Sequence, residues 1–230
     1  MNYNINELTP ILKTITVPAE DFYDDSDATL SFKKRTKKRL RFYHVKIKSG
    51  LTKIVIIFPD RDYVIKIPFN KYLDWEDDSS TAYVMSGATG DNTDGVWDYC
   101  AQEVYIYNLA KLYHLEKAFP ETIYLGKWNN YPIYLQEKCS PINDIDLDPS
   151  TEEEINDLSY EVSNLMQIND FPYIYLNWIC MYYLTYGKLD TVQLLKFIKF
   201  YGIDDLHTGN IGFSSLDDRP VLIDFSGFYS

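Results

Sequence analysis

The chain has 230 residues, of which 46% are hydrophobic, so it can bury a core as one large domain or as two small lobes. Its 34 acidic and 22 basic side chains give a formal charge of −12, which argues against nucleic-acid binding through the entire surface. Three widely spaced cysteines without a CxxC pattern indicate neither a disulfide framework nor a zinc site, and they favour a reducing, cytoplasmic location.

Residues 1–41 are interpreted as an N-terminal extension that ends in a basic strip, residues 33–41. Seven cations and no acid occur in this strip. It could contact RNA, DNA or an anionic partner. Alternatively it is the solvated edge of a strand or loop that balances the acidic remainder. The second interpretation is favoured, because charge runs are mostly just exposed.

Residues 42–138 predict an antiparallel sheet with one helix. Alternating and β-branched apolar residues predict the strands, and glycine or Pro-Asp clusters mark the turns. Residues 71–98 contain seven acids against one lysine and are interpreted as an acidic insertion. Asp98 can cap the helix that follows. The expected elements in chain order are strands at 42–48, 53–58 and 63–67, a helix from Asp98 towards Pro120, and a hairpin of strands at 123–125 and 133–136.

Residues 139–230 are mainly helical by pattern, so the chain as a whole predicts an α+β fold with two lobes. Ser150 or Thr151 can cap a helix whose first turn carries three glutamates, where the helix dipole favours acids. The apolar helix that follows is shorter than the roughly 20 residues that span a bilayer, so no membrane contact is expected. In chain order the expected helices lie at 150–169, 174–186 and 190–202, followed by a polar loop between short strands.

Five side chains in this arrangement suit phosphoryl transfer. That reaction needs a lysine on the phosphates, oxygen ligands for Mg²⁺ and a carboxylate near the attacking hydroxyl. Lys66 lies within an apolar strand, where an ammonium group must face a cleft or find a partner, and Glu103 is the obvious counter-ion. Asp205 and Asn210 share one short loop, and Asp224 is expected to reach the same point from the end of a neighbouring strand.

At these positions the chain resembles the protein-kinase-like phosphotransferases. Val64-Ile65-Lys66 resembles the Val-Ala-Ile-Lys strand of that family, and Glu103 resembles the acid of its helix C. Leu135-Gln136-Glu137-Lys138 resembles the hinge, and Asp224-Phe225-Ser226-Gly227 resembles the metal-binding Asp-Phe-Gly. The run from Asp205 to Asn210, Asp-Leu-His-Thr-Gly-Asn, resembles the catalytic loop, in a form closer to aminoglycoside-phosphotransferase-like enzymes than to eukaryotic-type kinases.

The resemblance implies a two-lobed protein-kinase-like fold, in which an antiparallel sheet with one helix forms the N-lobe and a reduced helical C-lobe follows. It also implies ATP and Mg²⁺ as cofactors. Lys66 would hold the phosphates of ATP and be oriented by Glu103. Asn210 and Asp224 would hold Mg²⁺, and Asp205 would position or deprotonate the acceptor hydroxyl.

The resemblance further implies which residues lie near the nucleotide base. Backbone groups around Glu137 and Cys139 would meet adenine, with Gln136 at the gatekeeper position. Gly50 is the one glycine in the loop that should cover the phosphates, so the backbone can approach them closely at a single point. His207 is interpreted as ordering the catalytic loop rather than acting as a base or a ligand.

The chain stops at Ser230, so the segment that binds peptide substrates in protein kinases is not expected. The leading hypothesis is a minimal, phage-type enzyme that transfers the γ-phosphate of ATP to a hydroxyl on a protein or small molecule. The alternatives are a pseudokinase that binds and inhibits a partner, and an acidic nucleic-acid mimic. A protein partner is expected to contact residues 71–98 or 33–41, in preference to nucleic acid.

Overall fold

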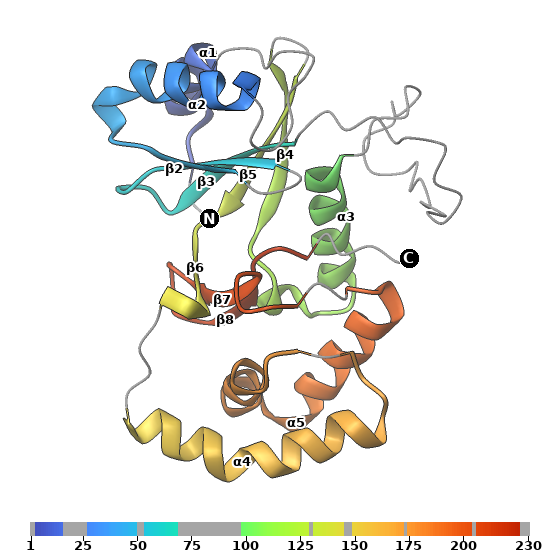
Figure 1. The fold of residues 1–230 in the computed structure, drawn as a ribbon. Coiled ribbons are helices and arrows are strands. Elements are labelled where there is room, and N and C mark those ends of the chain that lie inside the picture. The colour runs from blue at the N-terminus through green and yellow to red at the C-terminus, as the bar shows by residue number, and fades with distance from the viewer. Residues whose placement is uncertain are drawn as a thin grey trace. The chain divides into compact units, whose positions relative to one another are not determined.

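The computed structural model describes residues 3–15, 27–49, 53–68, 98–128, 131–144, 149–172, 174–203 and 206–225. The fold is α+β, as the sequence predicted. Its chain divides into two compact units (Figure 1). Unit 1 comprises residues 1–105 and 121–138, and unit 2 comprises residues 106–120 and 139–230.

A five-stranded antiparallel sheet forms the centre of unit 1. The three expected strands and the expected hairpin are confirmed, although residues 42–45 precede the first strand. The strand order is β1-β2-β3-β5-β4, and every residue of the central strand β3 is buried, so the sheet is covered on both faces. The strands are β1 (Lys46–Ser49), β2 (Lys53–Ile57), β3 (Tyr63–Pro68), β4 (Thr122–Trp128) and β5 (Tyr131–Glu137).

Two N-terminal helices, α1 (Ile5–Thr14) and α2 (Asp27–Arg39), cover one face of this sheet (Figure 1). Neither of these helices was predicted for residues 1–41, and the interpretation of the basic strip as a strand or loop edge was wrong. The buried residues of α2 recur every three or four positions, which is the spacing of one helix face. The shared apolar core includes Leu8, Ile11, Leu12, Phe32, Leu40, Ile54, Ile56, Ile65, Ile67, Ile133 and Leu135.

The helix α3 (Tyr99–Leu112) lies on the opposite face of the sheet, and its first turns belong to unit 1. Its predicted start is confirmed, because Oδ1 of Asp98 accepts the backbone N–H of Ala101 at 2.9 Å. Cys100 and Ala101 pack against Tyr134 of β5. Tyr134 points away from the core side chains of the same strand, since neighbouring residues in a strand face opposite ways.

Unit 2 is mainly helical, and its helices α4 (Pro149–Ile168) and α5 (Leu176–Tyr201) pack on each other. The two helices expected at 174–186 and 190–202 are the two halves of α5. They are separated at Gly187, whose φ of 82° is a conformation that glycine adopts readily. The end of α5 at Gly202 agrees with the prediction. Within the part of the chain that the structure describes, no helix is both long and apolar enough to cross a membrane.

A small antiparallel sheet in unit 2 joins β6 (Cys139–Pro141), β7 (Ile211–Ser214) and β8 (Pro220–Leu222). Gly212 of β7 must be glycine, because a Cβ atom there would lie 2.0 Å from the carbonyl oxygen of Ser140. The indole Nε1 of Trp178 donates to the carbonyl oxygen of Gly212 at 3.0 Å, which ties α5 to this sheet. Short 3₁₀ turns lie at η1 (Arg41–Tyr43), η2 (Glu116–Ala118) and η3 (Ile142–Asp144).

Candidate functional site

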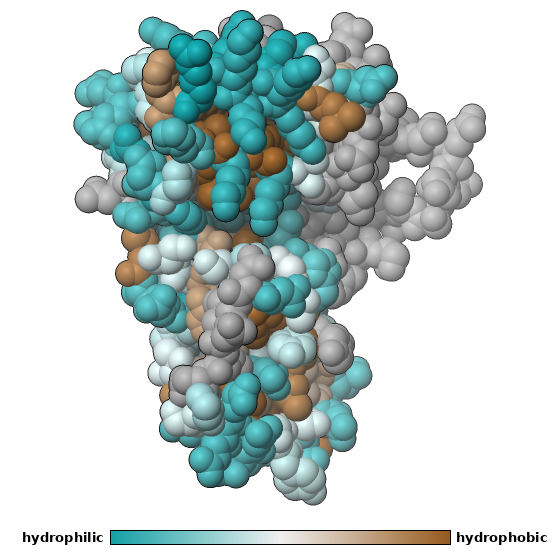
Figure 2. Space-filling model, turned by 60° about the vertical axis from the view of Figure 1, so that its left-hand side comes forward, coloured by the Kyte–Doolittle hydropathy of each residue, from teal (hydrophilic) through white to brown (hydrophobic). Residues whose placement is uncertain are grey.

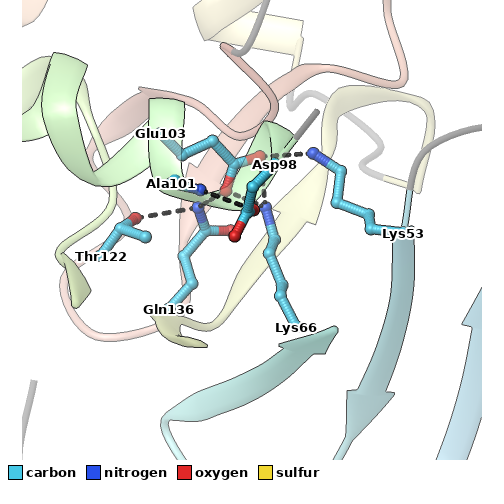
Figure 3. Close-up of polar contacts among 7 residues, drawn as sticks. All are labelled: Lys53, Lys66, Asp98, Ala101, Glu103, Thr122 and Gln136. Carbon is cyan, nitrogen blue, oxygen red and sulfur yellow. Dashed lines mark hydrogen bonds and ion pairs between the residues drawn. The ribbon is translucent and has the colours of Figure 1, made fainter. Parts of the chain in front are cut away.

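Glu103 of α3 is the centre of a buried polar cluster in unit 1 (Figure 3). Its Oε2 lies 2.7 Å from Nζ of Lys66 on β3, and its Oε1 accepts a hydrogen bond from Nζ of Lys53 on β2 at 2.5 Å. The side-chain amide of Gln136 on β5 donates to Oε2 of Glu103 at 3.1 Å and to Oγ1 of Thr122 at 3.0 Å. We call these five residues the Glu103 cluster.

The register of the sheet explains why the two lysines of the cluster meet one carboxylate. Lys66 pairs with Val55, which is two residues beyond Lys53 on the neighbouring strand. Since side chains alternate between the two faces of a strand, Lys53 and Lys66 project from the same face. Isoleucines at the intervening positions point to the other face and enter the apolar core. The face that carries the lysines is the one that α3 covers with Glu103.

The Glu103 cluster is almost completely shielded from solvent. Glu103 is 0% exposed, Lys66 is 3% exposed and Lys53 is 4% exposed. Both carboxylate oxygens of Glu103 contact Nζ of Lys66, at 2.9 and 2.7 Å, so the ammonium group is held from two sides. Buried charges require such partners because the transfer of a charged group out of water is costly in free energy. The structure therefore brings Lys66 and Glu103 together in the pairing that the family resemblance implies.

Asp98 lies beside the cluster at the start of α3 (Figure 3). Its Oδ1 caps the helix, and its Oδ2 accepts the hydroxyl of Tyr134. Burial raises the pKa of Asp98, because desolvation disfavours the charged carboxylate. This effect outweighs the hydrogen bonds from Tyr134 and the backbone and the positive charge of Lys53, which all favour the charged form.

The variant Asp98→Asn is expected to reveal a pH dependence of stability in the wild type. An aspartate whose pKa is higher in the folded than in the unfolded state stabilises the fold fully below the unfolded pKa. This contribution is lost as pH rises through the folded pKa. Lowering the pH from about 7 to about 4 should therefore raise the free energy of unfolding of the wild type relative to that of the variant. Urea unfolding at each pH measures the difference, and a constant difference would show that Asp98 has no raised pKa.

The residues expected near adenine lie at the end of β5 and the start of β6. Gln136 and Glu137 are 1% and 2% exposed, and the Gln136 amide is used within the Glu103 cluster. The backbone N–H of Glu137 donates to the carbonyl oxygen of Glu121 at 2.9 Å. In return, the side-chain Oε2 of Glu137 accepts a hydrogen bond from the backbone N–H of Glu121 at 3.1 Å. Cys139 belongs to unit 2, where it pairs with Ser214. Gln136 and Glu137 are thus fixed by their own sheet.

Asn210 and Asp224 lie side by side in unit 2. The carbonyl oxygen of Asn210 accepts the backbone N–H groups of Ile223 at 2.7 Å and of Asp224 at 3.3 Å. Asn210 precedes β7 and Asp224 follows β8, so the antiparallel pairing of these strands brings the two residues together. Their side chains offer an amide oxygen and a carboxylate, which are ligands that Mg²⁺ accepts.

A magnesium ion at this pair would depend on further oxygen ligands. Among the described residues, no three His, Cys, Asp or Glu side chains gather into a metal-binding group. Mg²⁺ is usually held by one or two carboxylates, and phosphate and water oxygens supply the rest of its octahedron. Asn210 and Asp224 therefore fit the metal-binding role that the resemblance implies, provided that the metal arrives with a phosphate ligand.

The backbone around Asn210 and Asp224 is anchored on both sides. Phe225 is fully buried, and its ring lies 5.0 Å from the ring of Phe119. Nδ1 of His207 accepts the backbone N–H of Gly209 at 2.9 Å, so the interpretation of His207 as a residue that orders its loop is confirmed.

Three of the sequence predictions lie outside the described residues. They concern Asp205, Gly50 and the acidic insertion apart from Asp98. In contrast, Lys53 is a cluster residue that sequence reasoning missed, because it was predicted as the first residue of a strand and was not considered as a partner of Glu103. The signal for it was the alternation of Lys53 with Ile54 and Ile56, which marks the lysine as belonging to the face opposite the apolar core.

No protein-family model, curated protein or solved structure matches this chain. The resemblance to the protein-kinase-like phosphotransferases therefore depends on the motifs of the chain and on how its own side chains are placed.

Proposed function

We propose that the protein is an ATP-dependent phosphotransferase with a protein-kinase-like fold, in which unit 1 is the N-lobe and unit 2 is the C-lobe. The observation that carries the proposal is the buried pair of Lys66 on the central strand and Glu103 on α3. A buried ion pair is commonly no more stabilising than apolar side chains of the same volume, so stability alone is a weak reason for it. A lysine held in place by a glutamate is suited to binding phosphate.

The remaining roles follow from the chemistry of the side chains. Asn210 and Asp224 would hold Mg²⁺ through their oxygen atoms, as their adjacency allows. ATP would supply the phosphoryl group: the oxygen of an acceptor hydroxyl bonds to the γ-phosphorus, and the bond from that phosphorus to the leaving oxygen of ADP breaks. Asp205 would take the proton of the hydroxyl. The acceptor would be a protein or a small molecule.

A nucleotide-binding or partner-binding protein without turnover, a pseudokinase, is the second candidate, and Lys53 favours it. The carboxylate of Glu103 is shared between Lys53 and Lys66, so Lys66 is not its sole basic partner. The segment from Lys48 to Lys53, which would have to cover the phosphates, contains a single glycine. Both features weaken the match to an efficient phosphate site.

Mg·ATP is expected to raise the melting temperature of the protein. A ligand at a hundredfold excess over its Kd stabilises the folded state by about 2.7 kcal/mol. For a chain of this size, that corresponds to a rise of roughly 5–10 °C. Differential scanning fluorimetry with Mg·ATP, with ATP in chelator and with Mg²⁺ alone measures the effect. Only the first should produce the full rise, because Asn210 and Asp224 would bind the metal together with the phosphates.

Matched variants test whether the proposed metal ligands are responsible. Asp224→Asn should reduce the rise, because it removes a carboxylate ligand. Asp218→Asn changes an exposed aspartate in the turn between β7 and β8, and should leave the rise unchanged. No rise with any nucleotide would contradict the proposal. A rise without phosphate transfer to any acceptor would favour the pseudokinase.

A further inference from the structure

The outward face of α2 is a concentrated basic surface on an acidic protein. The helix buries Thr29, Phe32 and Thr36 against the rest of unit 1. Five of its seven exposed positions are basic, the other two being Asp27 and Leu30, and Figure 2 shows hydrophilic side chains covering the part of unit 1 where α1 and α2 lie. The exposed or partly exposed cations from α2 to η1 are Lys33, Lys34, Arg35, Lys37, Lys38, Arg39 and Arg41.

The described residues around these seven cations provide no neutralising carboxylate. The contacts of Lys33, Arg35 and Arg39 are with Oγ of Ser49, Oγ of Ser31 and the carbonyl oxygen of Thr14, all uncharged. Within the described residues, none of the seven forms an ion pair with a carboxylate. The sequence contains no acid from residue 28 to residue 59. A basic surface of this kind is complementary to a polyanion.

The spacing of the cations also opposes the helix that carries them. Lys33 and Lys37, Lys34 and Lys38, and Arg35 and Arg39 are like charges four residues apart. Each such pair destabilises a helix by roughly 0.2–0.5 kcal/mol. Cations in the last turn partly offset this through the helix dipole. An anionic ligand that lies along α2 would relieve the repulsion.

The basic surface continues past the end of α2. Arg41 stacks over the ring of Phe42, with Cζ 4.7 Å from the ring centroid, and Phe42 is 77% exposed. On the edge strand β1, Lys46 and Lys48 are exposed. The contact of Lys33 with Ser49 places α2 beside this strand. We name α2, Arg41, Phe42 and β1 together the basic face.

We propose that the basic face binds single-stranded nucleic acid. Its lysines and arginines would contact the phosphates, and Phe42 with Arg41 would provide a platform on which a base stacks. An anionic membrane fits less well, because a helix that binds membranes inserts its apolar side chains into the lipid. Here Phe32 and Leu40 are 0% exposed in the core. The exposed apolar side chains of this surface, Leu30 at 51% and Phe42 at 77%, are two among seven cations and form no apolar helix face. The proposal does not depend on the phosphotransferase function.

The test compares two triple variants of the whole protein that have the same net charge. Lys34→Gln/Lys37→Gln/Lys38→Gln removes three exposed cations from α2, and Lys111→Gln/Lys127→Gln/Lys196→Gln removes three exposed cations elsewhere. Binding of fluorescently labelled single-stranded RNA and DNA of mixed sequence is followed by anisotropy over a range of salt concentrations. The plot of log K against log salt should have a slope of about −0.7 per phosphate contact.

The α2 variant should bind about 100-fold more weakly than the wild type at about 0.1 M salt, with a slope smaller by about 2. The control variant should bind like the wild type, and Phe42→Ala should weaken binding to single strands more than to a duplex, because only unpaired bases can stack. Equal losses in the two triple variants would overturn the proposal. Binding to vesicles with anionic lipids or to an acidic peptide, without binding to either nucleic acid, would also overturn it. The absence of binding to any of these probes would overturn it as well.

Discussion

Replacing Glu103 with alanine is expected to lower the free energy of unfolding by about 3–5 kcal/mol. In the wild type, Glu103 is 0% exposed, and its carboxylate contacts Nζ of both Lys53 and Lys66. Without it, two buried ammonium groups lose the carboxylate that both of them contact. Ammonium groups away from water are costly unless an anion compensates them. Urea unfolding followed by circular dichroism measures the change.

A surface glutamate provides the matched control for this experiment. Glu161 contacts Nζ of Lys188 at 2.8 Å and the hydroxyl of Tyr183 at 3.0 Å, but its side chain is 48% exposed. Because water screens such a pair, Glu161→Ala should leave the unfolding midpoint unchanged. If Glu161→Ala lowers the free energy of unfolding as much as Glu103→Ala does, burial of the Glu103 carboxylate is not the cause of the loss.

A second variant separates lost charge compensation from lost packing. Lys53→Met/Lys66→Met/Glu103→Leu replaces the three charges with apolar side chains of similar volume. It should regain much of the stability that Glu103→Ala loses, because apolar replacements of buried ion pairs are often neutral or stabilising. If the triple variant is as unstable as Glu103→Ala, packing rather than uncompensated charge is responsible.

Asp205→Asn and Asp224→Asn are each expected to reduce phosphate transfer by about 10²-fold or more. The first variant would remove the base that accepts the hydroxyl proton, and the second would remove the carboxylate that the structure places beside Asn210. ADP formation and transfer of label from γ-labelled ATP, with protein and small-molecule acceptors, measure the rate. Both substitutions fall within the chain segment of unit 2, so unit 1 should keep its stability in both variants.

The control for these variants is Asp218→Asn in the turn between β7 and β8. Asp218 is exposed and has a φ of 56°, a conformation that asparagine tolerates well. The Asp218→Asn variant should transfer phosphate at the same rate as the wild type. Equal rates in the wild type, Asp205→Asn and Asp224→Asn would place the base and the metal ligands elsewhere. No transfer by any of the four proteins would favour the pseudokinase.

Most helices and strands whose ends carry a local sequence signal could be predicted from the sequence. The hairpin of β4 and β5, the start of α3 at Asp98 and the end of α5 at Gly202 all follow from alternation, capping or glycine. These signals involve residues within a few positions of each other. The side-by-side placement of Asn210 and Asp224 also follows from short strands near each other in the chain.

The two N-terminal helices could not be predicted in the same way. The apolar stripe of α2 is short, and the cations around it dominate the composition of the segment. A helix of this length with like charges four residues apart is marginal on its own. It is stabilised by the sheet, because Phe32 packs into the same core as Ile54 and Ile65. This stabilisation depends on residues that are distant in the sequence.

The sequence by itself determined that Lys66 needs a partner and that Glu103, Asn210 and Asp224 are candidates for one chemistry, because the cost of burying a charge and the ligand preferences of Mg²⁺ are properties of residue types. Only the tertiary structure decided that Lys53 shares Glu103 with Lys66, and that the cations of residues 33–41 lie along a helix. The physical reason is that strand register and burial bring together side chains from distant segments, whereas periodicity and capping act between neighbours.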